Sequence, residues 1–371
     1  MAGEPLLEQN LDVMHGTLEK LMNREPPINY ARETYKDLNL WLAPGIMQVT
    51  GDSLKGFHSD GTVGNAKFVN PWAPTALIAK NITKEYTLPI QRHCQGGMLF
   101  NKVEASVNSG AERIFDVVKL QYRKARAELA DVKHAAMWGT LTGADDVDNP
   151  AGIPYWIVLG TQGSTGGWTG YQSRYNDGST PGTAFDCATL NSSASVNPNF
   201  ANYFADHQGN IDESLWGLVS SANMRLNFQG PTSVEGSSVP TVKYVVFTTI
   251  NVIETYKKMI LKMNAQVGPQ PMTAGYLSTA DVMLPGGIPM NWSNILDTAN
   301  ASLYGTDPIY GLNMNKIYPV YLNGWNDVLT EEDAPTNHLV TQKFIDWCGQ
   351  LAWSDERRRS GFLISNHPSN T

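Results

Sequence analysis

The sequence is poor in charged residues and in cysteine. Only 17% of its 371 residues are charged, and its three cysteines are Cys94, Cys187 and Cys348. They lie far apart without a CxxC spacing, so we expect free thiols in a reducing compartment rather than a disulfide framework. Apolar residues make up 42% of the chain, which excludes wholesale disorder. A chain of this size can bury a large core without metal or disulfide support.

The chain also lacks a basic excess and long apolar runs. Its formal net charge of -8 argues against a sequence-specific nucleic-acid binder, because phosphate contacts need a basic face. No stretch approaches the roughly 18 apolar residues of a membrane-spanning helix. Residues 1–5 lack the basic start and apolar run of a signal peptide. We therefore expect a soluble protein made in the cytoplasm, with no membrane partner.

Sequence motifs for phosphate or calcium binding are incomplete. The glycines of residues 160–182 are followed by Trp168 rather than by the Lys-Ser/Thr of a phosphate-binding loop, so this stretch is interpreted as a flexible surface loop. The acidic residues of 145–149 do not fit a calcium loop, because Ala151 and Ile157 stand where Gly and Glu are required. A turn held by Asp and Asn side chains is favoured over a weak calcium site.

Catalytic constellations are missing as well. The seven histidines form no HExxH motif, and His93 beside Cys94 is the one suggestive neighbouring pair. Adjacent strand residues face opposite ways, so a Cys-His nucleophile there would need a bend. The basic run 357–359 is interpreted as a source of ion pairs within or between subunits, with contact to packaged nucleic acid as the alternative. We predict no catalytic residue, no cofactor and no metal, and hence no enzyme.

The longest regular pattern covers residues 109–138. Ser109 suits an N-cap, and Glu112 three residues later completes a capping box. At roughly 1.5 Å per residue this helix would extend roughly 40 Å before it ends at Gly139. Spacings of three and four predict one buried face, formed by Ile114, Val118, Tyr122, Ala125, Leu129, Val132 and Ala136.

Two different patterns precede this helix. An apolar seam predicts an amphipathic helix that ends before Pro26 and Pro27, and it consists of Leu7, Leu11, Met14, Leu18 and Leu21. That helix is expected to dock on its own chain or a neighbour, or to contact a scaffolding or decoration partner. Residues 41–101 are punctuated by Gly and Pro and predict an extended hairpin, with strands such as 66–69 and 85–90.

The pattern after the long helix is typical of a compact α+β domain. A turn-rich stretch at 143–154 leads into the glycine-rich loop, and no fixed-period repeat follows. Helices are predicted at 211–227 and 250–264, and a strand of β-branched residues at 242–248. The closing part is predicted to hold a strand at 317–322, an acidic turn at 330–335, and apolar segments at 339–351 and 361–364 that return to pack beside the long helix.

Three segments in this order resemble the major capsid protein of tailed double-stranded DNA bacteriophages, whose fold is shared with encapsulins. The first is 137–143 followed by 149–153, where the long helix ends in that family. The second is 244–247 followed by 252–258, a strand and then a helix. The third is 347–364, similar to the closing strands. The resemblance covers nearly the whole chain.

The resemblance implies an α+β fold with four parts. An N-terminal arm would comprise residues 1–47, and an extended β-hairpin arm residues 48–100. The long spine helix and closing strands, 101–139 and 317–371, would form a peripheral domain, and residues 140–316 an axial domain. Some members cross-link an arm lysine to an asparagine of a neighbour. Lys55 and Lys67 could lie on such an arm, but no partner Asn or catalytic Glu aligns here.

The resemblance also implies a function. The chain would self-assemble as pentamers and hexamers into the icosahedral capsid shell of a virion, assembled in the host cytoplasm, with non-specific contact to packaged DNA. About 40 residues precede the arm, too few for a built-in scaffold, so a separate scaffolding protein is expected, with a portal and possibly a decoration protein. The alternatives are an encapsulin-like compartment and a monomeric β-rich hydrolase.

Overall fold

The computed structural model describes 18 stretches of the chain. They are residues 37, 47–50, 55–59, 83–87, 92–101, 111–141, 148–160, 162–169, 186–187, 190–191, 200–226, 244–267, 282–284, 288–298, 301–314, 316–331, 340–353 and 360–368. The predicted N-terminal helix, the predicted N-cap Ser109 and the basic run 357–359 lie outside them.

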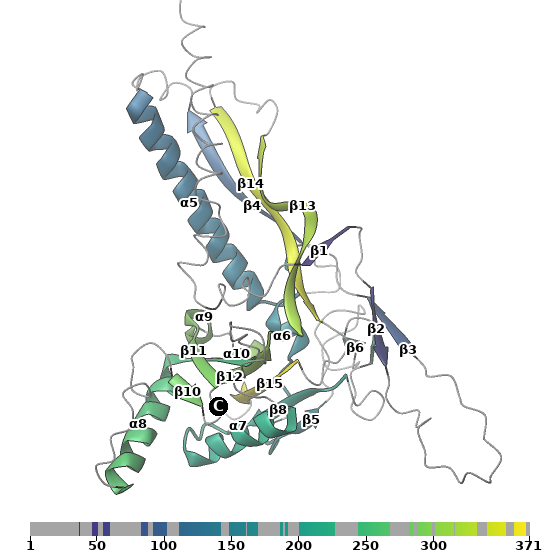
Figure 1. The fold of residues 1–371 in the computed structure, drawn as a ribbon, viewed down its shortest axis with the longest axis vertical. Helices are drawn as coiled ribbons and strands as arrows, with labels where there is room; N and C mark the ends of the chain where they lie inside the picture. Colours follow the sequence, from purple (N-terminus) through teal and green to yellow (C-terminus); the bar gives the residue numbers. More distant parts are fainter. Residues whose placement is uncertain are drawn as a thin grey trace, which may run out of the picture. The chain divides into compact units, whose positions relative to one another are not determined.

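The chain divides into two compact units. The first unit consists of Met1–Gly51, Gln91–Met137 and Pro319–Gln350. The second unit consists of Asp52–Ile90, Trp138–Tyr318 and Leu351–Thr371. Figure 1 labels most of the helices and strands of both units.

The first unit contains the long helix predicted from the sequence. Helix α5 spans Ala111–Met137, which confirms the element. Val118, Tyr122 and Leu129 are buried and pack with Met98, Phe100 and Ile345 of the adjoining sheet. Val132 is 51% exposed, however, so its predicted burial was wrong. The buried stripe continues from Leu129 to Lys133, one full turn on, because the packed face follows the period of the helix.

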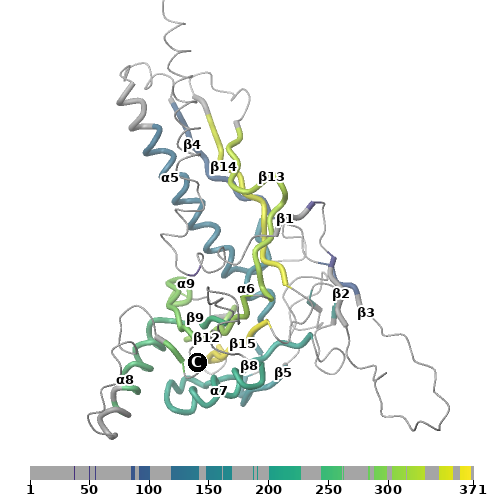
Figure 2. Tube along the Cα trace, viewed as in Figure 1, coloured from purple at the N-terminus to yellow at the C-terminus, as the bar shows by residue number. Residues whose placement is uncertain are grey.

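Beside α5 lies a four-stranded sheet with the order β1-β13-β14-β4. Its strands are β1 (Met47–Val49), β13 (Ile317–Glu331), β14 (Val340–Trp353) and β4 (Arg92–Asn101). Strands β14 and β4 are antiparallel, with Val340 opposite Asn101. Figure 2 shows α5 running along β4 and β14. One face of β4 packs against the helix, since Met98 and Phe100 are buried while Leu99 is 54% exposed.

Strand β13 is longer than predicted. The sequence suggested a strand at 317–322 and an acidic turn from 330, but pairing continues to Glu331. Gly324 and Asp327 adopt positive φ angles of 84° and 55°, so the polar stretch that resembles a turn bends within the strand instead of ending it.

The second unit is built on a seven-stranded mixed sheet with the order β10-β11-β9-β12-β15-β8-β5. The strands are β10 (Val282–Leu284), β11 (Ile288–Trp292), β9 (Tyr244–Thr248), β12 (Thr306–Asn313), β15 (Gly361–Asn366), β8 (Asn202–Asp206) and β5 (Gly167–Thr169). The helices with it are α6 (Ile153–Trp156), α7 (Glu213–Leu226), α8 (Ile250–Val267), α9 (Asn294–Asp297) and α10 (Ala301–Tyr304). Helices α7 and α8 and strand β9 confirm the elements predicted at 211–227, 250–264 and 242–248.

The core of the second unit forms where α7 and α8 cover the sheet. Leu215 and Val219 of α7, and Val252 and Tyr256 of α8, are buried with Val246 and other apolar residues of the strands. A second group is aromatic, with Trp353 stacked on Trp156 at 5.7 Å and edge-on to Phe200 at 4.9 Å. The α+β fold class predicted from the sequence is confirmed.

The closing segment is divided differently from the predicted domains. Strand β15 lies between β12 and β8 in the sheet of the second unit, rather than beside the long helix. All six of its residues are buried, as expected for a central strand bonded on both edges. This placement could not be predicted from the sequence, because a short apolar run does not indicate which sheet the strand joins.

The hairpin region contains one described strand pair. Strands β2 (Lys55–Ser59) and β3 (Thr83–Thr87) are antiparallel, with Lys55 opposite Thr87. Strand β3 overlaps the strand predicted at 85–90, whereas the one predicted at 66–69 lies outside the described residues. A further small pair joins β6 (Asp186–Cys187) to β7 (Leu190–Asn191).

Candidate functional site

The carboxyl ends of four strands meet at one edge of the seven-stranded sheet. Trp292 at the end of β11 pairs with Thr248 of β9, and Ser365 of β15 pairs with Asp206 of β8. Ligands of open α/β sheets bind at such edges. Polar side chains are buried along this edge, namely Asp206, His207, Thr249, Ser293, Ser365 and Asn366.

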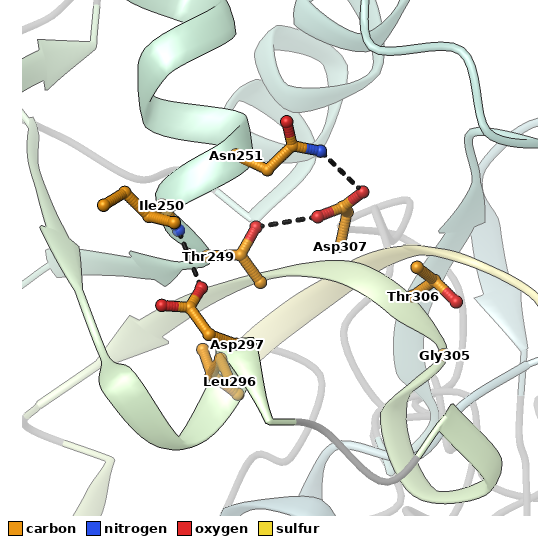
Figure 3. Close-up of a pocket in the computed structure, with 8 residues that line it drawn as sticks. All are labelled: Thr249, Ile250, Asn251, Leu296, Asp297, Gly305, Thr306 and Asp307. Atoms are coloured by element: carbon orange, nitrogen blue, oxygen red, sulfur yellow. Dashed lines mark hydrogen bonds between the residues drawn. The ribbon is translucent and has the colours of Figure 1, made fainter.

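A pocket of about 320 Å³ opens at this edge, where β9 passes into α8 (Figure 3). Three segments line it: the first turn of α8, the end of α9, and the turn that leads into β12. The lining residues are Thr249, Ile250, Asn251, Leu296, Asp297, Gly305, Thr306 and Asp307.

Two carboxylates hold the first turn of α8. Asp297 accepts hydrogen bonds from the Ile250 backbone N–H at 2.8 Å and from Trp292 Nε1 at 2.5 Å. Asp307 accepts from Thr249 Oγ1 at 2.9 Å and from Asn251 Nδ2 at 3.0 Å (Figure 3). Both therefore satisfy polar groups at the helix start and favour its positive end.

The turn before β12 requires its glycine. Gly305 has φ of 75°, and a Cβ atom there would overlap Ser365 Oγ and the Asn366 carbonyl oxygen. Asp307 also has a positive φ, of 49°. This conformation costs little for Gly, while the hydrogen bonds to Thr249 and Asn251 hold the aspartate in place.

His207 is a buried neutral base behind the pocket. Its Nε2 lies 3.4 Å from the Asp307 carbonyl oxygen, which requires this nitrogen to carry the proton. Its Nδ1 is buried, and no described residue offers it a hydrogen bond. Burial lowers the pKa of His207 below its ordinary value, while the Asp307 carbonyl and the charges of Asp307 and Asp206 act in the opposite sense.

Asp206 organises the glycine-rich segment that was interpreted as a loop. Its carboxylate accepts from the backbone N–H groups of Gly163 at 2.7 Å, Gln208 at 2.9 Å and His367 at 3.2 Å. The segment then continues into β5, so the interpretation of 160–182 as loop throughout was wrong. The strand escaped detection because its core, Gly167-Trp168-Thr169, is only three residues long.

The carboxylates of this edge hold neighbouring segments of the chain together. Asp206, Asp297 and Asp307 each accept hydrogen bonds from backbone or side-chain groups of those segments. No three His, Cys, Asp or Glu residues come close enough to hold a metal ion in the part of the chain that the structure describes. This pocket was not predicted from the sequence, because Thr249, Asp297 and Asp307 come from three separate segments of the chain that only the folded sheet brings together.

The neighbouring pair His93 and Cys94 is separated by the two faces of β4. His93 Nε2 lies 3.1 Å from Asp346 Oδ1, and its ring contacts Trp325 edge-on at 5.6 Å. Cys94 packs against the cluster that contains Val118. Burial raises the pKa of the Cys94 thiol, so the reactive thiolate is disfavoured at neutral pH.

The remaining residues that the sequence singled out either make contacts within the fold or lie outside the described residues. Lys55 pairs with Glu85 at 2.7 Å across the β2–β3 hairpin. Asp148 and Asn149 are described, but the other acidic residues of 145–149 are not, and Lys67 also lies outside. Cys94, Cys187 and Cys348 are free thiols, as predicted. Among the described helices, none is long and apolar enough to cross a membrane.

Solved structures share this architecture. One is the capsid of cyanophage A-1(L), 12% identical, with 90% of this chain and 93% of that chain covered at a TM-score of 0.58. Others are the capsid of a native GTA particle, 14% identical over 88% and 90% at 0.49, and the capsid of Myoviridae phage XM1, 12% identical over 88% and 92% at 0.47.

Comparison by sequence gives no relative. No protein-family model matches the chain, and no curated protein matches it. At 12% identity the likeness to the cyanophage A-1(L) capsid establishes the fold alone, and the high coverage extends it to nearly the entire chain. The expectation drawn from the order of elements is therefore confirmed: the protein has the fold of a tailed-phage capsid protein.

Proposed function

We propose that this chain is the structural subunit of an icosahedral capsid that encloses the double-stranded DNA genome of a tailed phage. The observation that carries the proposal is the shared fold with the cyanophage A-1(L) capsid over 90% of the chain. The work of such a subunit is association rather than catalysis, so no active site is required. The pocket at the start of α8 supports this view, because its two carboxylates accept hydrogen bonds from the start of that helix.

The proposed domains follow the same fold. Residues 1–47 would be an N-terminal arm and 48–100 a hairpin arm. Residues 101–139 and 317–350 would be peripheral. Residues 140–316 would be axial together with 351–371, because strand β15 belongs to the sheet of the second unit. The arms would bury area against neighbours that one subunit alone cannot supply. The further partners would be a separate scaffolding protein, a portal, packaged DNA and possibly a decoration protein, with assembly in the host cytoplasm.

Particle size tests the proposal directly. The chain would be expressed alone and with a candidate scaffolding protein, then examined by size-exclusion chromatography and negative-stain microscopy. We expect megadalton particles of uniform diameter. A species near 41 kDa under every condition would contradict the proposal, since 40.8 kDa is the mass of one chain.

The contents of the particles separate two kinds of shell. A phage capsid is expected to package double-stranded DNA in an infected host, whereas an encapsulin-like compartment would contain protein cargo. Nuclease-protected DNA from purified particles would support the capsid. Particles that contain one enzyme and no genome would favour the compartment.

A further inference from the structure

Two exposed apolar side chains lie at the start of α8. Trp292, at the end of β11, is 50% exposed, and Ile250, in the first turn of α8, is 48% exposed. Asp297 lies beside both, because it accepts hydrogen bonds from the Ile250 backbone N–H (Figure 3) and from Trp292 Nε1. The bond to Nε1 holds the indole ring in place, so a large apolar side chain is fixed at the surface. We call Trp292, Ile250 and Asp297 the α8 patch.

The α8 patch is negatively charged as well as apolar. Asp297 is exposed, and it lines the same pocket as Asp307. Within the described residues, the groups that donate to these two carboxylates are uncharged: a backbone amide, an indole, a hydroxyl and a side-chain amide. Each oxygen of Asp297 accepts one hydrogen bond and has a lone pair for another. A partner that matches the patch therefore brings both apolar surface and a positive charge.

A lysine side chain combines these two properties. Its aliphatic stem covers apolar surface while its ammonium group stays at a polar partner. An ammonium group near the face of an indole ring is also favourable. A phosphate group would be repelled by the carboxylates, and a purely apolar segment would leave them without a cation. The patch thus fits a lysine from a protein partner rather than a nucleic acid.

An exposed lysine is present in the second half of the same helix. Lys262 is exposed, and residues 255–267 contain no Asp or Glu. No described carboxylate forms an ion pair with Lys262, whereas Lys258, one turn earlier, lies 3.9 Å from Glu254. Helix α8 therefore has an acidic, apolar patch at its start and an uncompensated positive charge further along.

We propose that the α8 patch binds Lys262 of a second copy of this chain. The patch cannot bind Lys262 of its own copy, because Ile250 and Lys262 are about 18 Å apart along one rigid helix at about 1.5 Å per residue. Each copy carries both halves of the contact, so the contact can repeat from one copy to the next. A head-to-tail contact of this kind produces a closed ring when its rotation fits.

This inference rests on the proposed function, since it assigns one contact between shell subunits. It is tested with Lys262→Glu and Ile250→Lys, both at exposed positions. Each variant alone should raise the subunit concentration needed for assembly by about tenfold or more, because like charges then meet. Each should keep the circular dichroism of the wild type. Lys262→Arg is the matched control, because it keeps the charge, and it should assemble near the wild-type concentration.

The double variant tests whether the two positions meet. With Ile250→Lys and Lys262→Glu in one chain, the new lysine of each copy faces the new glutamate of the next. We therefore expect the double variant to assemble at a lower concentration than either single variant. Effects that simply add, and leave the double variant worse than both, would overturn the inference, because positions that do not touch behave in that way.

Two further outcomes are distinguishable. A Lys262→Glu variant that assembles normally but retains less nuclease-protected DNA would assign Lys262 to nucleic acid and overturn the inference. If the wild type forms no particles at all, the proposed function fails. If the wild type forms particles and both single variants assemble like it, only this contact is wrong.

Discussion

Gly96 of β4 lies directly beneath the backbone of Ala125 in α5. A Cβ atom at position 96 would come within 3.1 Å of the Ala125 carbonyl oxygen and 3.5 Å of Leu129 Cβ. The absence of a side chain here lets the helix and the sheet approach closely, and the burial of Val118 and Leu129 depends on that approach.

Replacement of Gly96 by Val should loosen this contact. The larger side chain forces α5 away from β4, and overpacking of this kind typically costs about 1–3 kcal/mol. Chemical denaturation would measure the loss in the free energy of unfolding. Gly97→Val is the matched control, because a Cβ atom there meets only the Phe344 ring, at an ordinary 3.6 Å. Equal losses for both variants would contradict the role given to Gly96.

A charge on the buried face of α5 should prevent correct folding. Val118→Asp or Leu129→Asp places a carboxylate at a site that is 1% or 2% exposed, with no described cation beside it in the cluster. We expect insoluble or unassembled protein, measured by the soluble fraction after expression. Val132→Asp should remain soluble, because Val132 is 51% exposed. Soluble, assembled Val118→Asp and Leu129→Asp would show that another face is buried.

The buried pair of Lys133 and Asp327 should be costly to break from one side. Lys133 Nζ contacts Asp327 Oδ1 with the two side chains only 10% and 6% exposed, and Nζ lies 5.1 Å from the centre of the Trp347 ring. Lys133→Met would leave the carboxylate buried alone, at a cost of about 3–5 kcal/mol.

The double variant Lys133→Met with Asp327→Asn serves as the control, because it removes both charges and Asn tolerates the positive φ of 55° at position 327. It should recover most of the lost free energy of unfolding in denaturation experiments. A double variant as unstable as Lys133→Met would mean that packing, rather than the unpaired charge, dominates at this site.

Acidification should destabilise the second unit through His207. Its folded pKa lies below the ordinary 6.5, so the unfolded chain binds the proton more readily. The contribution of His207 to the free energy of unfolding is fully present above about pH 6.5. It decreases as the pH falls toward the pKa that His207 has in the folded protein. His207→Gln can keep a donor to the Asp307 carbonyl without titrating. Between pH 7.5 and pH 5.5, the thermal midpoint of the wild type should fall more than that of the variant; equal shifts would exclude His207 as the cause.

The elements with a strong period were predictable from the sequence. Helix α5 follows from apolar spacings of three and four, and α7, α8 and β9 were found within a few residues of their bounds. Val132 was misjudged because position 133 continues the stripe equally well by spacing, and the aliphatic stem of a lysine can also be buried. Only the Asp327 carboxylate and the Trp347 ring, distant in sequence, explain why Lys133 lies inside.

The site was not predictable in the same way. The pocket needs Asp297 from the end of α9, Asp307 from the start of β12 and the first turn of α8, so no local motif predicts it. The placement of β15 between β12 and β8 is equally non-local, because its partners are about 50 and 160 residues away in sequence.

The seven-stranded sheet ends on both sides in strands of three residues, β10 and β5. A long, unpaired strand edge can form backbone hydrogen bonds with an extended segment of another chain. Identical chains at high local concentration are then prone to aggregate. Short outer strands leave few backbone groups for such pairing. In the shell proposed above, subunits at high local concentration would thus avoid pairing their sheets into fibres, and they would associate through other surfaces.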